Sequence, residues 1–139
     1  ELNLNGFDTS NVTDMYGVLS ENYNLVNLNI SSFDTRNVTN MNSMFCECES
    51  IDILDLSNFN TANVQDMNSM FACCYNLEKI YVSDTFTTDS VVKGEWMFSD
   101  SPNLVGEAGT TYDCYRASST YAHIDEGETN PGYFTRKEN

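Results

Sequence analysis

The sequence is poor in basic residues, with 6 lysines and arginines against 21 aspartates and glutamates and a formal net charge of −15 at pH 7. A chain this acidic repels polyphosphates and anionic lipid surfaces. It also lacks the cations whose phosphate contacts release counterions and drive nucleic-acid binding. The composition therefore argues against nucleic acid as a partner.

Long hydrophobic runs are also missing. No stretch of about 18 apolar residues occurs, so the sequence predicts no membrane-spanning segment and no direct membrane insertion. No basic and apolar leader is present, and Glu1 begins a strand pattern in the middle of a repeat. We expect the chain to be a fragment or a mature piece, with any export signal or wall anchor outside it.

Residues that would support catalysis are scarce. His123 is the only histidine, and although Asp125 lies two positions further on, no nucleophile with a supporting motif accompanies them. We expect His123 to lie at the surface or in a terminal cap. Trp96, the only tryptophan, is expected to pack where that cap begins. The sequence thus predicts no enzyme, no catalytic residues and no cofactor.

What the sequence does have is a repeated line. The pattern Phe-Asp/Asn-Thr-Xaa-Asn-Val-Xaa-Asp/Asn-Met begins at Phe7, Phe33 and Phe59, a period of 26 residues, and a decayed copy one residue longer begins at Phe86. A fixed period of this length is typical of stacked supersecondary units, each in contact only with its neighbours. We expect repeats of 26–27 residues over 1–104, the first of them partial.

Each repeat opens with the alternation of a half-buried strand. One strand per repeat, always at the same position, predicts a parallel sheet that runs across the repeats. Leucines or isoleucines that lead into each strand complete the Leu-x-x-Leu-x-Leu pattern of leucine-rich repeats. The inward strand positions are Leu2/Leu4, Leu28/Ile30, Leu54/Leu56 and Ile80/Val82.

A stripe of apolar residues follows each strand with the spacing of a short helix. Asn11, Asn37 and Asn63 precede the stripes and are of the N-cap type, and Asp14 or Asp66 three residues later would offset the helix dipole. The expected fold is therefore α/β, with strands on one side and short helices on the opposite side. In the third repeat the stripe consists of Val64, Met67, Met70, Phe71 and Cys74.

Polar residues recur in columns too. Because stacking brings equivalent residues together, we expect Thr9, Thr35 and Thr61, like the three asparagines, to bond the backbone of the adjacent repeat. A column of Asp8, Asp34 and Asn60 offers oxygen ligands that would alternatively suit calcium. No glycine-rich turn accompanies that column, so no metal site is predicted.

Five cysteines leave several thiol roles open. Cys48 and Cys74 share an apolar column and are expected to serve as small buried hydrophobic residues. Cys46 and Cys73 lie off that column on neighbouring repeats, and a disulfide between them stays open. Their spacing differs from that of common zinc sites.

Periodicity ends after Leu104, and we expect residues 105–139 to form an irregular C-terminal cap that closes the last hydrophobic face. The apolar area for it is expected to come from Tyr112, Tyr115, Tyr121, Tyr133 and Phe134. The last three residues, 137–139, are expected to fray or to begin a linker.

The line from Leu54 to Leu77 resembles the BspA-like leucine-rich repeat of bacterial surface proteins. The ending, with Gly109-Thr110-Thr111-Tyr112-Asp113 and Pro131-Gly132-Tyr133-Phe134-Thr135, is similar to the segment that closes such arrays. The resemblance implies a leucine-rich-repeat solenoid, an extracellular or bacterial cell-surface location, and adhesion to host proteins or other bacteria without catalysis.

The exposed sheet face of such a stack is broad, rigid and tolerant of side-chain change. We expect it to bind a host or bacterial surface protein or a glycan. The alternatives are a structural stalk or spacer and a self-associating surface-layer module, with self-association also possible at the open N-terminal edge. The candidate binding residues are Asn27, Asn29, Ile53, Asp55, Lys79 and Tyr81.

Overall fold

The computed structural model describes residues 1–138. The strands it contains are short, and each of the first four opens one 26- or 27-residue turn of the chain, which we call a coil. Two short 3₁₀ helices lie in the C-terminal segment. In order, the elements are β1 (Leu2–Asn3), β2 (Leu28–Asn29), β3 (Ile53–Asp55), β4 (Lys79–Val82), η1 (Ser119–Tyr121), η2 (Gly127–Thr129) and β5 (Phe134–Arg136).

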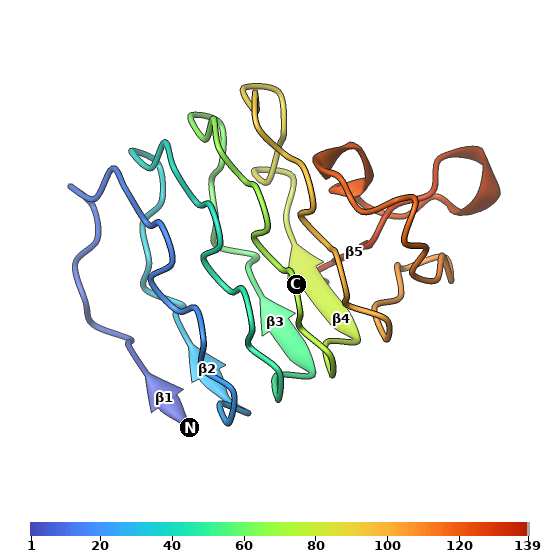
Figure 1. The fold of residues 1–139 in the computed structure, drawn as a ribbon. Coiled ribbons are helices and arrows are strands. Elements are labelled where there is room, and N and C mark those ends of the chain that lie inside the picture. The colour runs from blue at the N-terminus through green and yellow to red at the C-terminus, as the bar shows by residue number, and fades with distance from the viewer. Residues whose placement is uncertain (139) are drawn as a thin grey trace.

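The coils lie side by side, from the N-terminal coil in blue to the fourth in yellow, and the C-terminal segment covers the far end (Figure 1). All strand pairs are parallel, and equivalent positions face each other: Leu2 pairs with Leu28, and Leu54 with Ile80. The strands form two sheets, β1-β2 and β3-β4-β5, so the predicted ladder is interrupted between the second and third coils.

The short helices predicted after each strand do not form anywhere in residues 1–138, and this part of the α/β prediction is wrong. The reason lies in the backbone hydrogen bonds. In the first coil the N–H groups of alternate residues, Met15, Gly17 and Leu19, donate to carbonyls of the second coil at 2.8, 2.9 and 3.0 Å. Donors that serve the neighbouring coil cannot bond four residues back along their own chain.

Between these inter-coil bonds the chain makes tight turns. Gly17, Ser43 and Ser69 occupy equivalent positions and have φ values of 60°, 57° and 55°. A second column of positive φ contains Glu21 and Glu47, at 60° and 61°. Left-handed residues that recur four positions apart rule out a continuous right-handed helix.

The asparagines predicted as N-caps bond between coils instead. The side-chain amides of Asn37 and Asn63 donate to the carbonyls of Ser10 and Arg36 in the preceding coils, both at 2.7 Å. Asp14 and Asp66 accept hydrogen bonds from the N–H two residues ahead, so they fix local turns and offset no helix dipole.

The threonine ladder forms as the sequence predicts. The Thr35 hydroxyl donates to the carbonyl of Asn60 and accepts from the N–H of the same residue, both at 2.9 Å. Thr61 makes the same pair of bonds to Thr87 at 2.7 Å. Each buried hydroxyl thus satisfies one donor and one acceptor of the next coil.

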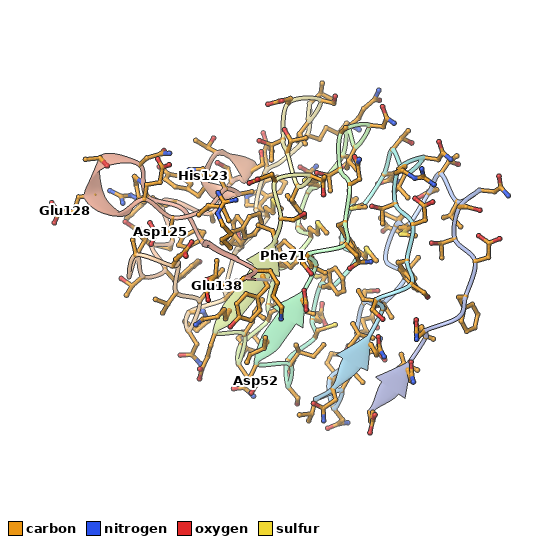
Figure 2. The ribbon with its side chains drawn as sticks, turned by 180° about the vertical axis from the view of Figure 1, so that it is seen from behind. Asp52, Phe71, His123, Asp125, Glu128 and Glu138 are labelled. Carbon is orange, nitrogen blue, oxygen red and sulfur yellow. The ribbon has the colours of Figure 1, made fainter. Side chains whose placement is uncertain are left out.

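The interior is built from apolar columns that continue from coil to coil. Phe45, Phe71 and Phe98 stack with ring centroids 5.7 and 5.6 Å apart, and Phe134 from the C-terminal segment closes the stack edge-on. Phe71 lies in the middle of the molecule (Figure 2). Exposure varies within a column, since Phe7 is 63% exposed and Phe59 is fully buried.

The C-terminal segment adds backbone bonds and apolar area to the fourth coil. Phe98 N donates to Ala117 O at 2.9 Å, Ser119 N donates to Gly94 O at 2.7 Å, and β5 extends the sheet beside β4. Tyr133 is fully buried, as expected, but the prediction that Tyr115 adds apolar area to the cap is wrong, because its side chain is 92% exposed.

The prediction that Trp96 packs at the junction with the cap is wrong, because its side chain is 61% exposed. Trp96 has φ of 53° and occupies the left-handed position that Ser43 and Ser69 hold in earlier coils. The core positions beside it are taken by Met97 and Phe98.

Candidate binding surface

The strands bring four of the six predicted binding residues into one cluster. Ile53 faces Lys79, and Asp55 faces Tyr81, across the β3–β4 pair. Ile53 is 51% exposed, whereas Lys79 and Tyr81 are half-buried. Alternate residues of these strands point inward, so the outward set is the one that the period-2 pattern predicts.

The other two predicted residues, Asn27 and Asn29, belong to the β1–β2 side of the break in the sheet. They remain exposed and line a hollow of about 400 Å³ together with Ile53. A second hollow, of about 190 Å³, is lined by Asn29 and Asp55. The six residues therefore border a continuous stretch of surface, although only four of them sit on the paired strands β3 and β4.

Lys137 belongs to this surface and was not predicted. Its backbone N–H donates to Val82 O at 3.0 Å, so the expectation of a frayed end is wrong for this residue. Its ammonium lies 3.1 Å from a carboxylate oxygen of Asp55 and 4.5 Å from the centre of the Tyr81 ring. Lys79 approaches the same ring at 5.8 Å, so two cations flank Tyr81.

These contacts determine the charge state of Asp55. Burial alone would raise the pKa of this carboxyl, but hydrogen bonds from Ser57 and Lys137 outweigh burial and lower the pKa. Asp55 is therefore charged at neutral pH and oriented by its partners. Both side chains of the Asp55–Lys137 ion pair are about half-exposed, so the pair adds little to the free energy of unfolding. Its main effect is to orient the Asp55 carboxylate.

Strand β5 lies along the far side of Tyr81. Thr135 is the register partner of Tyr81, and Arg136 N donates to Glu107 Oε2 at 3.2 Å. The Arg136 guanidinium also pairs with Asp84. Residues from the C-terminal segment thus extend the surface that the repeats begin.

Comparison with protein families finds a match over most of the chain. A family model described as "Mycoplasma protein of unknown function, DUF285" matches residues 1–110. The chain belongs to this family. Membership is compatible, in coarse terms, with a bacterial surface protein built from repeats. No curated protein and no solved structure matches the chain.

In this DUF285 chain, His123 and Asp125 do not form a pair. His123 Nδ1 lies 2.8 Å from the carbonyl of Ile124, whereas Asp125 accepts its hydrogen bonds from Thr110 and from backbone N–H groups of the surrounding loops. Both residues lie in the C-terminal segment, apart from the loop tip that carries Glu128 (Figure 2). Asp125 therefore organises these loops.

The carboxylates of the acidic column that would suit calcium accept hydrogen bonds from residues of their own coils. Asp8 accepts hydrogen bonds from the N–H and hydroxyl of Ser10, and Asp34 binds the backbone and guanidinium of Arg36. The Arg36 contacts lower the pKa of Asp34 to about 2. Within residues 1–138 no group of three or more His, Cys, Asp or Glu side chains is arranged to hold a metal.

The thiols divide as predicted into buried and partly exposed groups. The Sγ atoms of Cys48 and Cys74 lie 3.1 Å from carbonyls of the preceding coil, and burial raises the pKa of Cys48 to about 11. Cys46 and Cys73 are half-buried free thiols in this structure.

Membrane-spanning helices are not found among residues 1–138, since none of the helices there has the length and apolar character that a span requires.

Proposed function

We propose that this chain is a non-catalytic binding module that works outside the cell or at the bacterial cell surface. It recognises a protein or glycan partner through the outward side chains of β2, β3 and β4. One observation carries the proposal: Ile53, Asp55, Lys79 and Tyr81 stand side by side on paired strands.

The chemistry of this cluster suits recognition. Ile53 and Tyr81 offer apolar and aromatic contact area, and aromatic residues are enriched among those that dominate binding energy. The ammonium groups of Lys137 and Lys79 lie 4.5 and 5.8 Å from the centre of the Tyr81 ring and help to hold it in place. A side chain that is already ordered loses less entropy when a partner binds.

We propose further that the coils form a solenoid of the BspA-like leucine-rich-repeat type, with tight turns in place of helices. The in-register parallel strands and the threonine ladder support this assignment. Adhesion and a surface location are proposed because the resemblance to that repeat type implies them.

Self-association is the second candidate. The first coil exposes 63% of Phe7 and 52% of Val18, whose equivalents Phe33 and Met44 are buried. A second copy of the chain would cover this face. Light scattering of the purified chain and of a Phe7→Ser variant tests it, since only a wild-type dimer that the variant loses supports this candidate.

The binding proposal is tested with the purified chain on surfaces coated with extracellular-matrix proteins and on whole bacterial cells. The double variant Ile53→Ala/Tyr81→Ala is expected to bind about tenfold or more weakly, as at typical interface hot spots. The matched control is Tyr115→Ala, because Tyr115 is 92% exposed and lies outside the cluster. Equal binding by the wild type and the double variant would refute the assignment.

A further inference from the structure

One buried polar atom in the described chain lacks a partner. Thr135 Oγ1 is the single buried side-chain nitrogen or oxygen in residues 1–138 without a hydrogen bond, and the residue is only 9% exposed. A buried group left unsatisfied costs about 1–3 kcal/mol. Native proteins pair almost all such groups, and the exceptions call for an explanation such as a functional role or a bound molecule.

Thr135 lies where two hollows meet. One hollow, of about 650 Å³, is lined by Lys79, Glu107 and Thr135 among others. The second, of about 340 Å³, is lined by Tyr81, Glu107 and Thr135 together with Arg136 and Lys137. We call the two together the Thr135 groove. Both volumes fall in the range of about 300–1,000 Å³ that is typical of small-ligand sites.

The groove offers both kinds of hydrogen-bonding group. The Thr135 hydroxyl can donate and accept, the Lys79 ammonium donates, and the Glu107 carboxylate accepts. One oxygen of that carboxylate already holds Arg136 N–H, which fixes the side chain across the groove. The Tyr81 ring adds an aromatic wall beside these polar groups.

The charged residues of the groove and the net charge of the chain limit the class of ligand that the groove can bind. Three of the chain's six basic residues, Lys79, Arg136 and Lys137, line this groove. Arg136 and Lys137 are paired with Asp84 and Asp55, so they are not free to attract an anion. The net charge of −15 repels anionic ligands from the whole molecule. The lining also carries three acidic residues, Glu78, Glu107 and Glu138, so the charges of the groove itself balance and do not select a cation either. An uncharged molecule rich in hydroxyl groups matches the groove best.

We propose that the Thr135 groove binds a neutral oligosaccharide. Thr135 Oγ1 is covered in this structure, so the side chains over it shift when the sugar binds and one sugar hydroxyl then completes the hydrogen bonding of Thr135 Oγ1. The inference rests on the proposed function and narrows it, from a protein or glycan partner of the strand surface to a glycan at the surface's C-terminal end. Thr135 and Glu107 are binding residues in addition to those that the repeats supply.

The experiment screens the labelled chain on a printed array of neutral oligosaccharides and their sialylated counterparts, then titrates the strongest neutral probe by calorimetry. Thr135→Val keeps the shape of the side chain and removes the hydroxyl. We expect its affinity for the probe to fall about tenfold, equivalent to about 1.4 kcal/mol. Its melting temperature should equal or exceed that of the wild type, because an unsatisfied hydroxyl has been removed.

Thr61→Val is the matched control. The Thr61 hydroxyl is buried and fully bonded to Thr87, so this variant should melt at a lower temperature and bind the sugar like the wild type. Unchanged sugar affinity in Thr135→Val overturns the inference, and with a lowered melting temperature it assigns the hydroxyl to an internal water. Stronger binding of sialylated probes also overturns it.

The two proposals fail separately. If the wild type binds matrix proteins in a manner that depends on Ile53 and Tyr81 but binds no neutral sugar, the glycan inference is wrong and the proposed function stands. If it binds neither matrix proteins, cells nor sugars, both are wrong.

Discussion

Replacement of Asp125 by asparagine tests whether one buried carboxylate holds the C-terminal segment together. Asp125 is 3% exposed. Its Oδ2 accepts from the N–H groups of Ala108 and Thr110, both at 2.9 Å. Its Oδ1 accepts from the Thr110 hydroxyl at 2.6 Å and from the N–H groups of Gly127 and Gly132 at 2.9 and 3.3 Å.

The amide of Asp125→Asn can replace only one of these oxygens as an acceptor. Whichever way it turns, its NH₂ group faces two backbone N–H donors that lose their acceptor. Each unsatisfied buried donor costs about 1–3 kcal/mol, so the two donors together are expected to lower the free energy of unfolding at pH 7 by about 2–6 kcal/mol.

The pH dependence gives an independent readout. Burial alone would raise the pKa of Asp125, but the hydrogen bonds from Thr110, Gly127 and Gly132 outweigh burial and lower the pKa to about 2. The pKa of an unfolded aspartate is about 3.9. A lowered folded-state pKa stabilises the protein fully above about pH 4, and this contribution disappears as the pH falls towards 2.

The assay is urea denaturation followed by circular dichroism between pH 2 and 7. The stability difference between wild type and Asp125→Asn should be constant above about pH 5 and shrink below pH 4. Asp113→Asn is the control, because the Asp113 side chain is 44% exposed and should give a difference below about 1 kcal/mol. A difference that is small, or equally large at pH 2.5 and pH 7, would refute the reasoning.

Three further predictions follow from burial and backbone conformation. Phe59→Ala should lower the free energy of unfolding by about 3–5 kcal/mol, because Phe59 is fully buried. Phe7→Ala should lower it by under about 1 kcal/mol, because Phe7 is 63% exposed although it occupies the same repeat position. Equal losses in urea denaturation would contradict this. With a maleimide reagent and mass spectrometry, exposed Cys114 should react first and Cys74 only on unfolding, because burial raises its pKa; fewer than five labelled thiols in denatured, non-reduced protein would reveal a disulfide. Trp96→Asn should raise stability by up to about 1 kcal/mol, since asparagine tolerates a φ of 53° better; a fall of more than 1 kcal/mol in the same denaturation assay would count against it.

The sequence predicts best where identical residues meet one period apart. Stacking alone predicts the inter-coil hydrogen bonds of Thr35 and Thr61 and the pairing of Leu54 with Ile80. Each residue lies beside the residue one period further along the chain, so its neighbour in the next coil is known from the sequence. Such arrangements need only the period and the side-chain chemistry.

The helices were mispredicted because two structures share one apolar spacing. A stripe at i, i+3 and i+6/7 fits a helix, but it equally fits successive tight turns whose alternate N–H groups bond the next coil. A signal was present in the small residues Gly17, Ser43 and Ser69, which hold the left-handed positions. Because these three positions are equivalent in the 26-residue repeat, the glycine at position 17 indicates a turn at all of them.

The candidate site contains residues that the repeat pattern predicts and residues that it does not. Asp55 and Tyr81 were found because they lie on strands that the repeat defines. Thr135 and Lys137 were missed because they follow a segment without periodicity, and no local pattern indicates that β5 returns beside β4. Long-range pairing of this kind depends on the whole fold.

The position of the site follows from the way repeats build a surface. Equivalent outward positions carry the same residue in the first two coils, Asn3 and Asn29, and different residues, Asp55 and Tyr81, in the next two. Distinct chemistry requires a departure from the repeat, and the outward residues depart first in the third coil, with Ile53 and Asp55, and again in the fourth, with Lys79 and Tyr81. There β5 adds Thr135, a residue outside the repeats whose hydroxyl has no internal partner. If the proposed function holds, a partner that selects this chain among other stacks of similar coils would gain most of its specificity at the junction of the repeats and the C-terminal segment, where the non-repeated donors and acceptors are held by backbone bonds.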